Sequence, residues 1–149
     1  MRNPYLKFFT LAFFVFLLDQ ATKLLIMKHL ALHQVIRIFP FFNIVYYRNI
    51  GSAFGLFKSL GNPFFIVISI VAIIGVSVLI IKDPQGRLGF SLILAGAAGN
   101  LADRLTHGYV VDFLELYAGH FYWPAFNVAD SALTVGITIL IVMTVFGRK

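Results

Sequence analysis

The sequence contains no cysteine, and charged side chains make up only 12% of its 149 residues. Because the chain has no thiol group, it cannot form disulfides, cysteine nucleophiles, iron–sulfur clusters or cysteine-bound zinc sites. The net charge is +6, but the basic residues are scattered and lack the aromatic interleaving of nucleic-acid binders. We therefore expect no nucleic-acid partner, and we assign the positive excess to anionic lipid headgroups.

Apolar residues, by contrast, make up 60% of the chain, and its mean hydropathy is +0.89. This composition is far from that of a soluble domain and predicts one integral membrane domain, residues 1–149. Four stretches approach the ~20 residues needed to cross the hydrocarbon core of a bilayer. The predicted spans are residues 8–27, 63–81, 88–107 and 128–146.

The lysine and arginine residues that flank the spans predict that both termini face the cytoplasm, because the positive-inside rule prefers basic residues in short cytoplasmic segments. The segment 28–62 then lies outside the cytoplasm. Its stretch 37–48 is rich in aromatic and β-branched residues, so we expect short strands on the membrane surface. The predicted cytoplasmic basic residues are Arg2, Lys7, Lys82, Arg87, Arg148 and Lys149.

The charged and amide side chains within the spans all fall near the ends that this topology places outside the cytoplasm, and Asn127 lies directly before the last span. Charged groups near hydrocarbon are costly and are normally retained for function. Their gathering at one side therefore predicts a single polar site at the outer leaflet. The set consists of Asp19, Gln20, Lys23, Asn100, Asp103, Arg104, Asn127 and Asp130.

Spacing indicates roles for some of these residues. Asp19 and Lys23 are four residues apart on one helix face, so we expect a structural ion pair rather than catalytic groups. Asp103 and Arg104 follow the small-residue stretch 95–99, which favours close helix packing. Two roles fit Arg104 equally well: neutralising Asp103, or donating hydrogen bonds to substrate carbonyl groups.

Two carboxylates, Asp112 and Asp130, flank an aromatic loop from opposite sides, where they could share one proton. Asn127 and Asp130 also suit an N-cap and a first helical turn, so capping alone would explain both residues. Asp112 lies in the apolar sequence Val-Val-Asp-Phe, a setting that raises the pKa of a carboxyl group. Glu115 is expected to be a charge at the membrane interface.

Nothing in the sequence predicts a metal or a cofactor. His29 and His33 are four residues apart, but they lack an acidic partner and an HExxH context. Serine nucleophiles are also not indicated, because Ser52, Ser59 and Ser91 have no neighbouring general base in the sequence.

Five segments together resemble the ordered motif set of lipoprotein signal peptidase, also called signal peptidase II. Each is weak evidence alone, but the set covers almost the whole chain in order and is highly specific. The segments are Asp19-Gln-Ala-Thr-Lys23, Asn49-Ile-Gly-Ser-Ala-Phe54, Gly96-Ala-Ala-Gly-Asn-Leu-Ala-Asp-Arg104, Val111-Asp-Phe113 and Phe126-Asn-Val-Ala-Asp130.

This resemblance implies an aspartic endopeptidase of the bacterial inner membrane that removes signal peptides from prolipoproteins. Cleavage is expected just before the lipobox cysteine, which already carries a diacylglyceryl group. The implied fold is an all-α membrane fold with a small β element: four transmembrane helices and an extracytoplasmic β-cradle between the first two. The implied partners are the lipid-modified prolipoprotein and membrane lipids, with the active site at the extracytoplasmic face of the membrane. We expect a monomer, although the sequence does not fix the oligomeric state.

The resemblance also assigns residue roles by position. It implies that Asp112 and Asp130 are the catalytic pair. Structural support is implied for Asp19, Lys23 and Asp103. The implied substrate-binding residues are Asn49, Gly51, Asn100, Arg104 and Asn127.

A small proton- or ion-coupled transporter is the alternative from another class, because intramembrane carboxylates also mark proton relays. A transporter should carry polar groups through to the cytoplasmic side, or show repeats around a site at the membrane midplane. The span 63–81 contains no charged residue, and no internal repeat is evident. The sequence therefore favours the peptidase.

Overall fold

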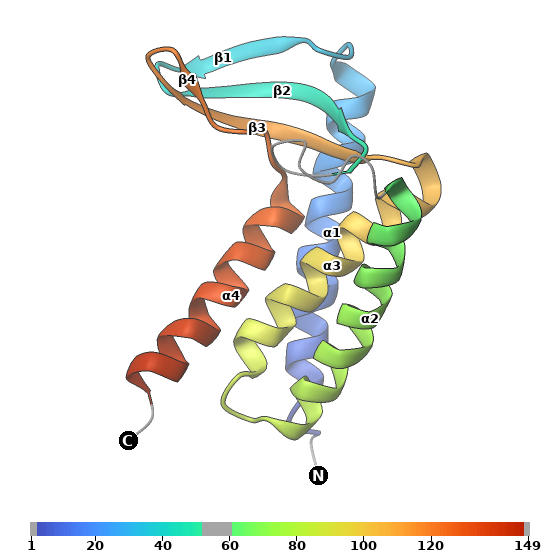
Figure 1. Ribbon diagram of the computed structural model, residues 1–149, viewed down its shortest axis with the longest axis vertical. Helices are drawn as coiled ribbons and strands as arrows, with labels where there is room; N and C mark the ends of the chain where they lie inside the picture. Colours follow the sequence, from blue (N-terminus) through green and yellow to red (C-terminus); the bar gives the residue numbers. More distant parts are fainter. Residues whose placement is uncertain (1–2, 52–60, 148–149) are drawn as a thin grey trace.

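The computed structural model describes residues 3–51 and 61–147. Within these ranges a bundle of helices carries a small antiparallel sheet at one end, and α1 begins and α4 ends at the opposite end (Figure 1). The helices are α1 (Leu6–His29), α2 (Gly61–Lys82), α3 (Arg87–His107) and α4 (Val128–Phe146). The strands are β1 (Val35–Phe39), β2 (Phe42–Asn49), β3 (Val110–Ala118) and β4 (Phe121–Tyr122).

Three of the helices, α1, α2 and α4, are long and apolar enough to cross a membrane. α3 falls outside this group because small and polar residues such as Asp103 and Arg104 lower its hydropathy. It packs against each of the other three helices, whereas α2 buries only Ile80. A helix surrounded by protein needs less apolar surface than one that faces lipid, so its composition follows from its central place.

Small residues allow α3 to lie close to its neighbours. A Cβ atom at Gly96 would overlap the Ala129 carbonyl of α4, and one at Gly99 would overlap the Asp19 carboxylate of α1. The close packing predicted for the stretch 95–99 is therefore confirmed. It brings the polar part of α1 and the first turn of α4 onto the same segment of α3.

The sheet has the order β1-β2-β3-β4, and each neighbouring pair is antiparallel. Strands were predicted only in the segment between the first two helices, where β1 and β2 lie. The structure adds β3 and β4, which come from the connection between α3 and α4 (Figure 1). The sheet thus joins the two connections on this end of the bundle.

The pairing of β2 with β3 contains a register shift. Tyr47 lies opposite Asp112, and Ile44 lies opposite Leu114, so one strand carries an extra residue between these pairs. Such bulges bend a strand and re-aim its side chains, and they are common beside active sites. Beyond the shift, Asn49 pairs with Val110, which brings the end of β2 to the start of β3.

Candidate active site

A cavity of about 840 Å³ lies where the sheet meets α2, α3 and α4. Side chains from β2, β3 and these three helices line it, together with the residues just before α4. Segments far apart in the sequence therefore contribute to one site. Six of the site residues predicted from the sequence line the cavity: Asn49, Gly51, Asn100, Arg104, Asp112 and Asp130.

Asp112 enters the cavity from β3, and only 3% of its surface is exposed. One carboxylate oxygen accepts a hydrogen bond of 2.8 Å from the Asn127 side-chain amide. The other accepts one of 2.9 Å from the Asn49 side-chain amide. Both oxygens of this buried carboxyl group thus have donors from different parts of the fold.

Asp130 lies in the first turn of α4 and completes a capping box with Asn127. Its backbone N–H donates to the Asn127 side-chain oxygen at 2.9 Å, while its carboxylate accepts the Asn127 backbone N–H at 3.2 Å. The predicted capping role of these two residues is therefore confirmed. The second carboxylate oxygen accepts a bond of 2.8 Å from the Asn100 amide, a contact that capping does not require.

Asn127 contacts both carboxylates and is completely buried. Because its side-chain oxygen accepts the Asp130 N–H, its amide nitrogen must point the other way, toward Asp112. The same nitrogen lies 3.2 Å from the Val111 carbonyl oxygen. The N-cap of α4 therefore also fixes the position of the β3 carboxylate.

Asn100 is oriented by a buried cation. The Lys23 ammonium donates to the Asn100 side-chain oxygen at 3.2 Å, so the amide nitrogen of Asn100 faces Asp130. The Asn127 amide approaches the same Asn100 oxygen at 3.3 Å. With these acceptor sites occupied, Asn100 presents only donor hydrogens to the Asp130 carboxylate.

Lys23 itself lies between two carboxylates, and its side chain is only 1% exposed. It pairs with Asp19 at 2.8 Å, as the spacing predicted, and with Asp103 at 3.1 Å. Asp19 also accepts the backbone N–H of Ala129 at 2.9 Å, and Asp103 accepts that of Val111 at the same distance. This cluster ties α1 and α3 to the start of α4 and to the start of β3.

Burial raises the pKa of Asp112 from 3.8 to about 7, and the nearby charge of Asp130 adds to this effect. The hydrogen bonds from Asn49 and Asn127 oppose it, because they stabilise the ionised form. The charge of Lys23 acts in the same opposing direction. A carboxyl group with such a pKa suits the role of a general acid or base near neutral pH.

Among the described residues, Arg104 forms no ion pair with Asp103, whose carboxylate pairs with Lys23. Its guanidinium instead donates to the Asn100 carbonyl oxygen at 3.3 Å and lies 5.0 Å from the centre of the Phe65 ring. Both contacts hold the group beside the cavity that it lines. Because arginine carries five N–H donors, several remain for a ligand.

Two polar features were missed or misplaced by the sequence analysis. Gln20, which received no role, donates toward Asp19 and Asp103 at 3.1 Å each and toward the Gly99 carbonyl oxygen at 3.2 Å. Glu115 is buried instead of interfacial, and it accepts a bond of 2.8 Å from Asn43 on the neighbouring strand. The contact between Asn43 and Glu115 depends on the pairing of strands that are far apart in the sequence, so the local sequence gives no indication of it.

Some predicted features lie outside the described residues: Ser52 to Phe54 of the second motif, Ser59, and the terminal Arg2, Arg148 and Lys149. Within the described residues, no group of three histidine, aspartate or glutamate side chains is arranged to hold a metal ion. The polar groups around the cavity are mainly amides and carboxylates, which suit proton transfer and hydrogen bonding to a peptide.

Comparison with known proteins gives a match along most of the chain. Residues 11–146 match the family model described as signal peptidase (SPase) II. This chain belongs to the signal peptidase II family. The resemblance carried by the five sequence segments is thereby confirmed, and the protein is a protease and hence a hydrolase.

Relatives within the family cover nearly the full length of the chain. A lipoprotein signal peptidase of Thermodesulfovibrio yellowstonii is 46% identical over 129 residues, which cover 87% of this chain and 88% of the relative. One of Francisella tularensis subsp. novicida is 41% identical over an alignment of 157 residues, covering 100% and 98%. A solved structure of a bacterial membrane enzyme matches with a TM-score of 0.85 at 34% identity, covering 96% of this chain and 92% of that one. The three apolar helices α1, α2 and α4 and the similarity to this membrane enzyme both indicate that the chain is a membrane protein.

Proposed function

We propose that this protein removes signal peptides from lipid-modified prolipoproteins, using a water molecule activated by Asp112 and Asp130. The observation that carries the proposal is the arrangement of these two carboxylates. They line one cavity, and each of their oxygens accepts a hydrogen bond from an amide or backbone N–H. The relatives' name, lipoprotein signal peptidase, supports the substrate class. Cleavage falls just before the cysteine that carries the diacylglyceryl group.

Two carboxyl groups at one site do not readily ionise together, so they hold one proton between them at neutral pH. The ionised group takes a proton from water, while the protonated group donates a hydrogen bond to the scissile carbonyl oxygen. The hydroxide equivalent adds to the carbonyl carbon, and the amide bond then breaks as a proton passes to the leaving nitrogen. The products are the signal peptide with a new carboxylate and a lipoprotein with a free amino terminus.

The cavity extends from the carboxylates along the apolar faces of three helices, which supports a substrate that is itself membrane-embedded. A signal peptide is an apolar segment, and burying it against apolar side chains is favourable. The cavity's apolar lining includes Phe65, Ile68 and Ala72 of α2, Ala97 of α3 and Leu133 of α4.

Polar residues on the cavity wall then hold the peptide backbone next to the dyad. Arg104 donates to a substrate carbonyl group, a role supported by its place beside Phe65 and by its remaining donors. Asn49 accepts the Gly51 N–H at 3.1 Å, so the end of β2 presents backbone as well as the amide side chain at the cavity. Asn100 and Asn127 act on the substrate through the carboxylates that they position.

The whole chain acts as one membrane domain and as a monomer in the bacterial inner membrane. We infer that all four helices cross the membrane: α1, α2 and α4 are long and apolar enough to do so, and α3 packs against all three of them. Both termini face the cytoplasm, which places the sheet and the dyad at the extracytoplasmic face. Lys7, Lys82 and Arg87 support this orientation because they lie at the ends of helices away from the sheet.

A transporter is the less favoured function. The polar network described above gathers at the sheet end of the bundle, and α2 carries no charged residue before Lys82. A proton relay needs polar groups that continue across the membrane. Membership of a peptidase family also argues against it.

The experiment is a cleavage assay with purified enzyme and one prolipoprotein, prepared with and without its diacylglyceryl group. The lipid-modified form should be cleaved before its cysteine, and Asp112→Asn should nearly abolish cleavage. Asp83→Asn is the matched control, because it removes a carboxylate from the turn between α2 and α3 while keeping the oxygen that accepts the Gln85 N–H. Equal cleavage of the unmodified form would contradict the proposed substrate. Turnover by Asp112→Asn would contradict the proposed mechanism.

A further inference from the structure

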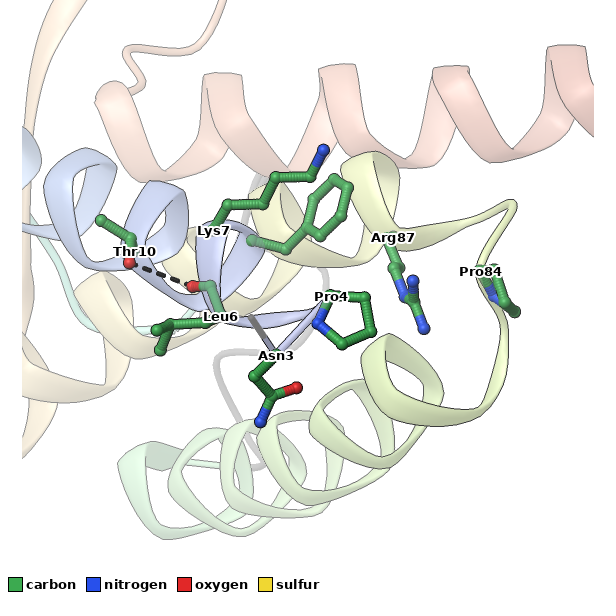
Figure 2. Close-up of a pocket in the computed structure, with 8 residues that line it drawn as sticks. Asn3, Pro4, Leu6, Lys7, Thr10, Pro84 and Arg87 are labelled. Atoms are coloured by element: carbon green, nitrogen blue, oxygen red, sulfur yellow. Dashed lines mark hydrogen bonds between the residues drawn. The ribbon is translucent and has the colours of Figure 1, made fainter. Parts of the chain in front are cut away.

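A second cavity, of about 990 Å³, lies at the end of the bundle opposite the sheet. Figure 2 shows it between the segment that leads into α1, the first turns of α1, and the connection between α2 and α3. The proposed peptidase mechanism gives this hollow no role, since both carboxylates lie at the other end. Its lining residues are Asn3, Pro4, Leu6, Lys7, Phe8, Thr10, Pro84 and Arg87.

The charge of this cavity is of one sign. Lys7 and Arg87 supply two cations, and none of the described residues that line the hollow is acidic. Asp83 lies in the adjoining turn, but one of its carboxylate oxygens accepts the backbone N–H groups of Gln85 at 3.1 Å and Gly86 at 3.4 Å. The hollow therefore favours an anion.

Arg87 is held in place before any ligand arrives. Its guanidinium donates to the Ile80 carbonyl oxygen at 2.9 Å and to that of Ile81 at 3.3 Å, both in the last turn of α2. These bonds use two of the five N–H donors of arginine, and the remaining donors suit the oxygens of a phosphate. A guanidinium fixed in this way loses little side-chain freedom when it binds an anion.

Apolar residues border the cations directly. Leu6 is 61% exposed, and Pro4, Phe8 and Pro84 line the same hollow. The site also lies where α1 and α3 begin, at the level of the lipid headgroups for helices that cross a membrane. Two cations on the wall of one cavity, beside exposed apolar surface at this depth, match an anionic phospholipid, which combines a phosphate with acyl chains.

We infer that this cavity binds the phosphate group of one anionic phospholipid from the leaflet at the N-terminal end of α1. Lys7 and Arg87 contact the phosphate oxygens, and the acyl chains lie along Leu6 and the exposed side of α1. The bound lipid links the start of α1 to the connection between α2 and α3. This site is independent of the dyad, so it can be tested without measuring cleavage.

The experiment measures lipid binding to the full chain in a neutral detergent, with native mass spectrometry to count bound molecules. One molecule of dioctanoyl phosphatidylglycerol should bind per protein, even in the presence of excess neutral detergent. Zwitterionic dioctanoyl phosphatidylcholine should bind more weakly. Lys7→Gln should weaken phosphatidylglycerol binding about fivefold, because one basic residue near a lipid surface contributes about that factor. Lys7 is exposed, so the variant should remain folded.

Arg37→Gln is the matched control, since it removes one positive charge from β1 at the other end of the molecule. It should bind phosphatidylglycerol as the unchanged protein does. An equal loss in both variants would show that only net charge matters and would overturn the site. Saturable binding of sodium phosphate that displaces phosphatidylglycerol would overturn the lipid as the ligand, and so would unchanged binding in Lys7→Gln. Arg87→Gln should show a larger loss than Lys7→Gln, with thermal unfolding to check its fold.

Discussion

Lys23 on α1 and Asn100 on α3 are joined by a buried hydrogen bond of 3.2 Å. Asn100 passes this constraint on, since its amide nitrogen donates to Asp130 at 2.8 Å. The same ammonium neutralises Asp19 and Asp103. One cation therefore both stabilises the bundle and sets the direction of a donor at the candidate dyad.

Lys23→Met should strongly destabilise the protein, because it leaves two carboxylates buried without their cation. Removing one partner of a buried ion pair typically costs about 3–5 kcal/mol. Thermal unfolding of the purified protein in detergent measures the loss. Asp19→Asn should be milder, since Lys23 keeps its pair with Asp103. A smaller loss in Lys23→Met than in Asp19→Asn would contradict this account.

The triple variant Asp19→Asn, Lys23→Met, Asp103→Asn separates stability from positioning. It removes all three charges together, so much of the stability lost in Lys23→Met should return. Asn100 still lacks the cation that orients its amide, so kcat should stay below that of the unchanged enzyme by about tenfold. Full recovery of kcat would show that Lys23 serves stability alone.

Asp112→Asn and Asp130→Asn should each lower the single-turnover rate constant of cleavage by roughly a thousandfold, because each removes a group that the proposed mechanism uses to transfer a proton. The double variant should be scarcely worse than either single variant, since groups that act as a unit are not additive. Single-turnover cleavage of a lipid-modified prolipoprotein provides the measurement. Were Asp130 only a cap, its asparagine variant would lose about 1 kcal/mol of stability at most and keep most of its activity.

Asn49→Ala should move the alkaline limb of the pH–activity profile to higher pH. Asn49 donates to the ionised form of Asp112, and this bond lowers a pKa that burial has raised to about 7. Without it the pKa rises further, so the proton shared by the dyad is lost at higher pH, by about one pH unit. Asn43→Ala is the control, because its amide contacts Glu115 instead. A shift to lower pH would contradict the assignment.

Asp112→Asn should also make the protein more stable above neutral pH. The pKa of Asp112 is 3.8 before burial and about 7 in the fold, so the unchanged protein loses stability as pH rises from 3.8 to about 7. The asparagine variant does not titrate, and its advantage should grow through this window to at most about 4 kcal/mol. Unfolding temperatures at pH 5 and pH 8 test this, and a variant less stable than the parent at pH 8 would contradict it.

The bounds of the helices could be predicted closely, because an apolar run of about 20 residues can form few structures other than a membrane-spanning helix. The first span was expected at 8–27 and is observed as Leu6–His29, and the last was expected and found at 128–146. β3 was missed, although Val110, Val111 and Phe113 are typical strand residues. Its pairing joins residues as distant as Asn43 and Glu115, which are 72 positions apart, and no local pattern shows such a contact.

The candidate site was predictable as a set of residues but not as a network. Helix spacing indicated the pair of Asp19 and Lys23, and cap preferences indicated Asn127. The second partner of Lys23, Asp103, depends on how closely α1 and α3 approach, and glycines on α3 set that approach. The bond from Asn127 to Asp112 depends on the register of β3 against β2. Both are properties of tertiary packing.

The cap of α4 shares its residues with the candidate dyad: Asn127 begins the helix and binds Asp112, and Asp130 closes the capping box. The next N–H of the helix, from Ala129, is held by Asp19 on α1. Docking of α4 against α1 thus holds the same helical turn that orients Asn127 and carries Asp130. Under the proposed mechanism, the contact between the first and last helices is therefore a condition for the two carboxylates to act together.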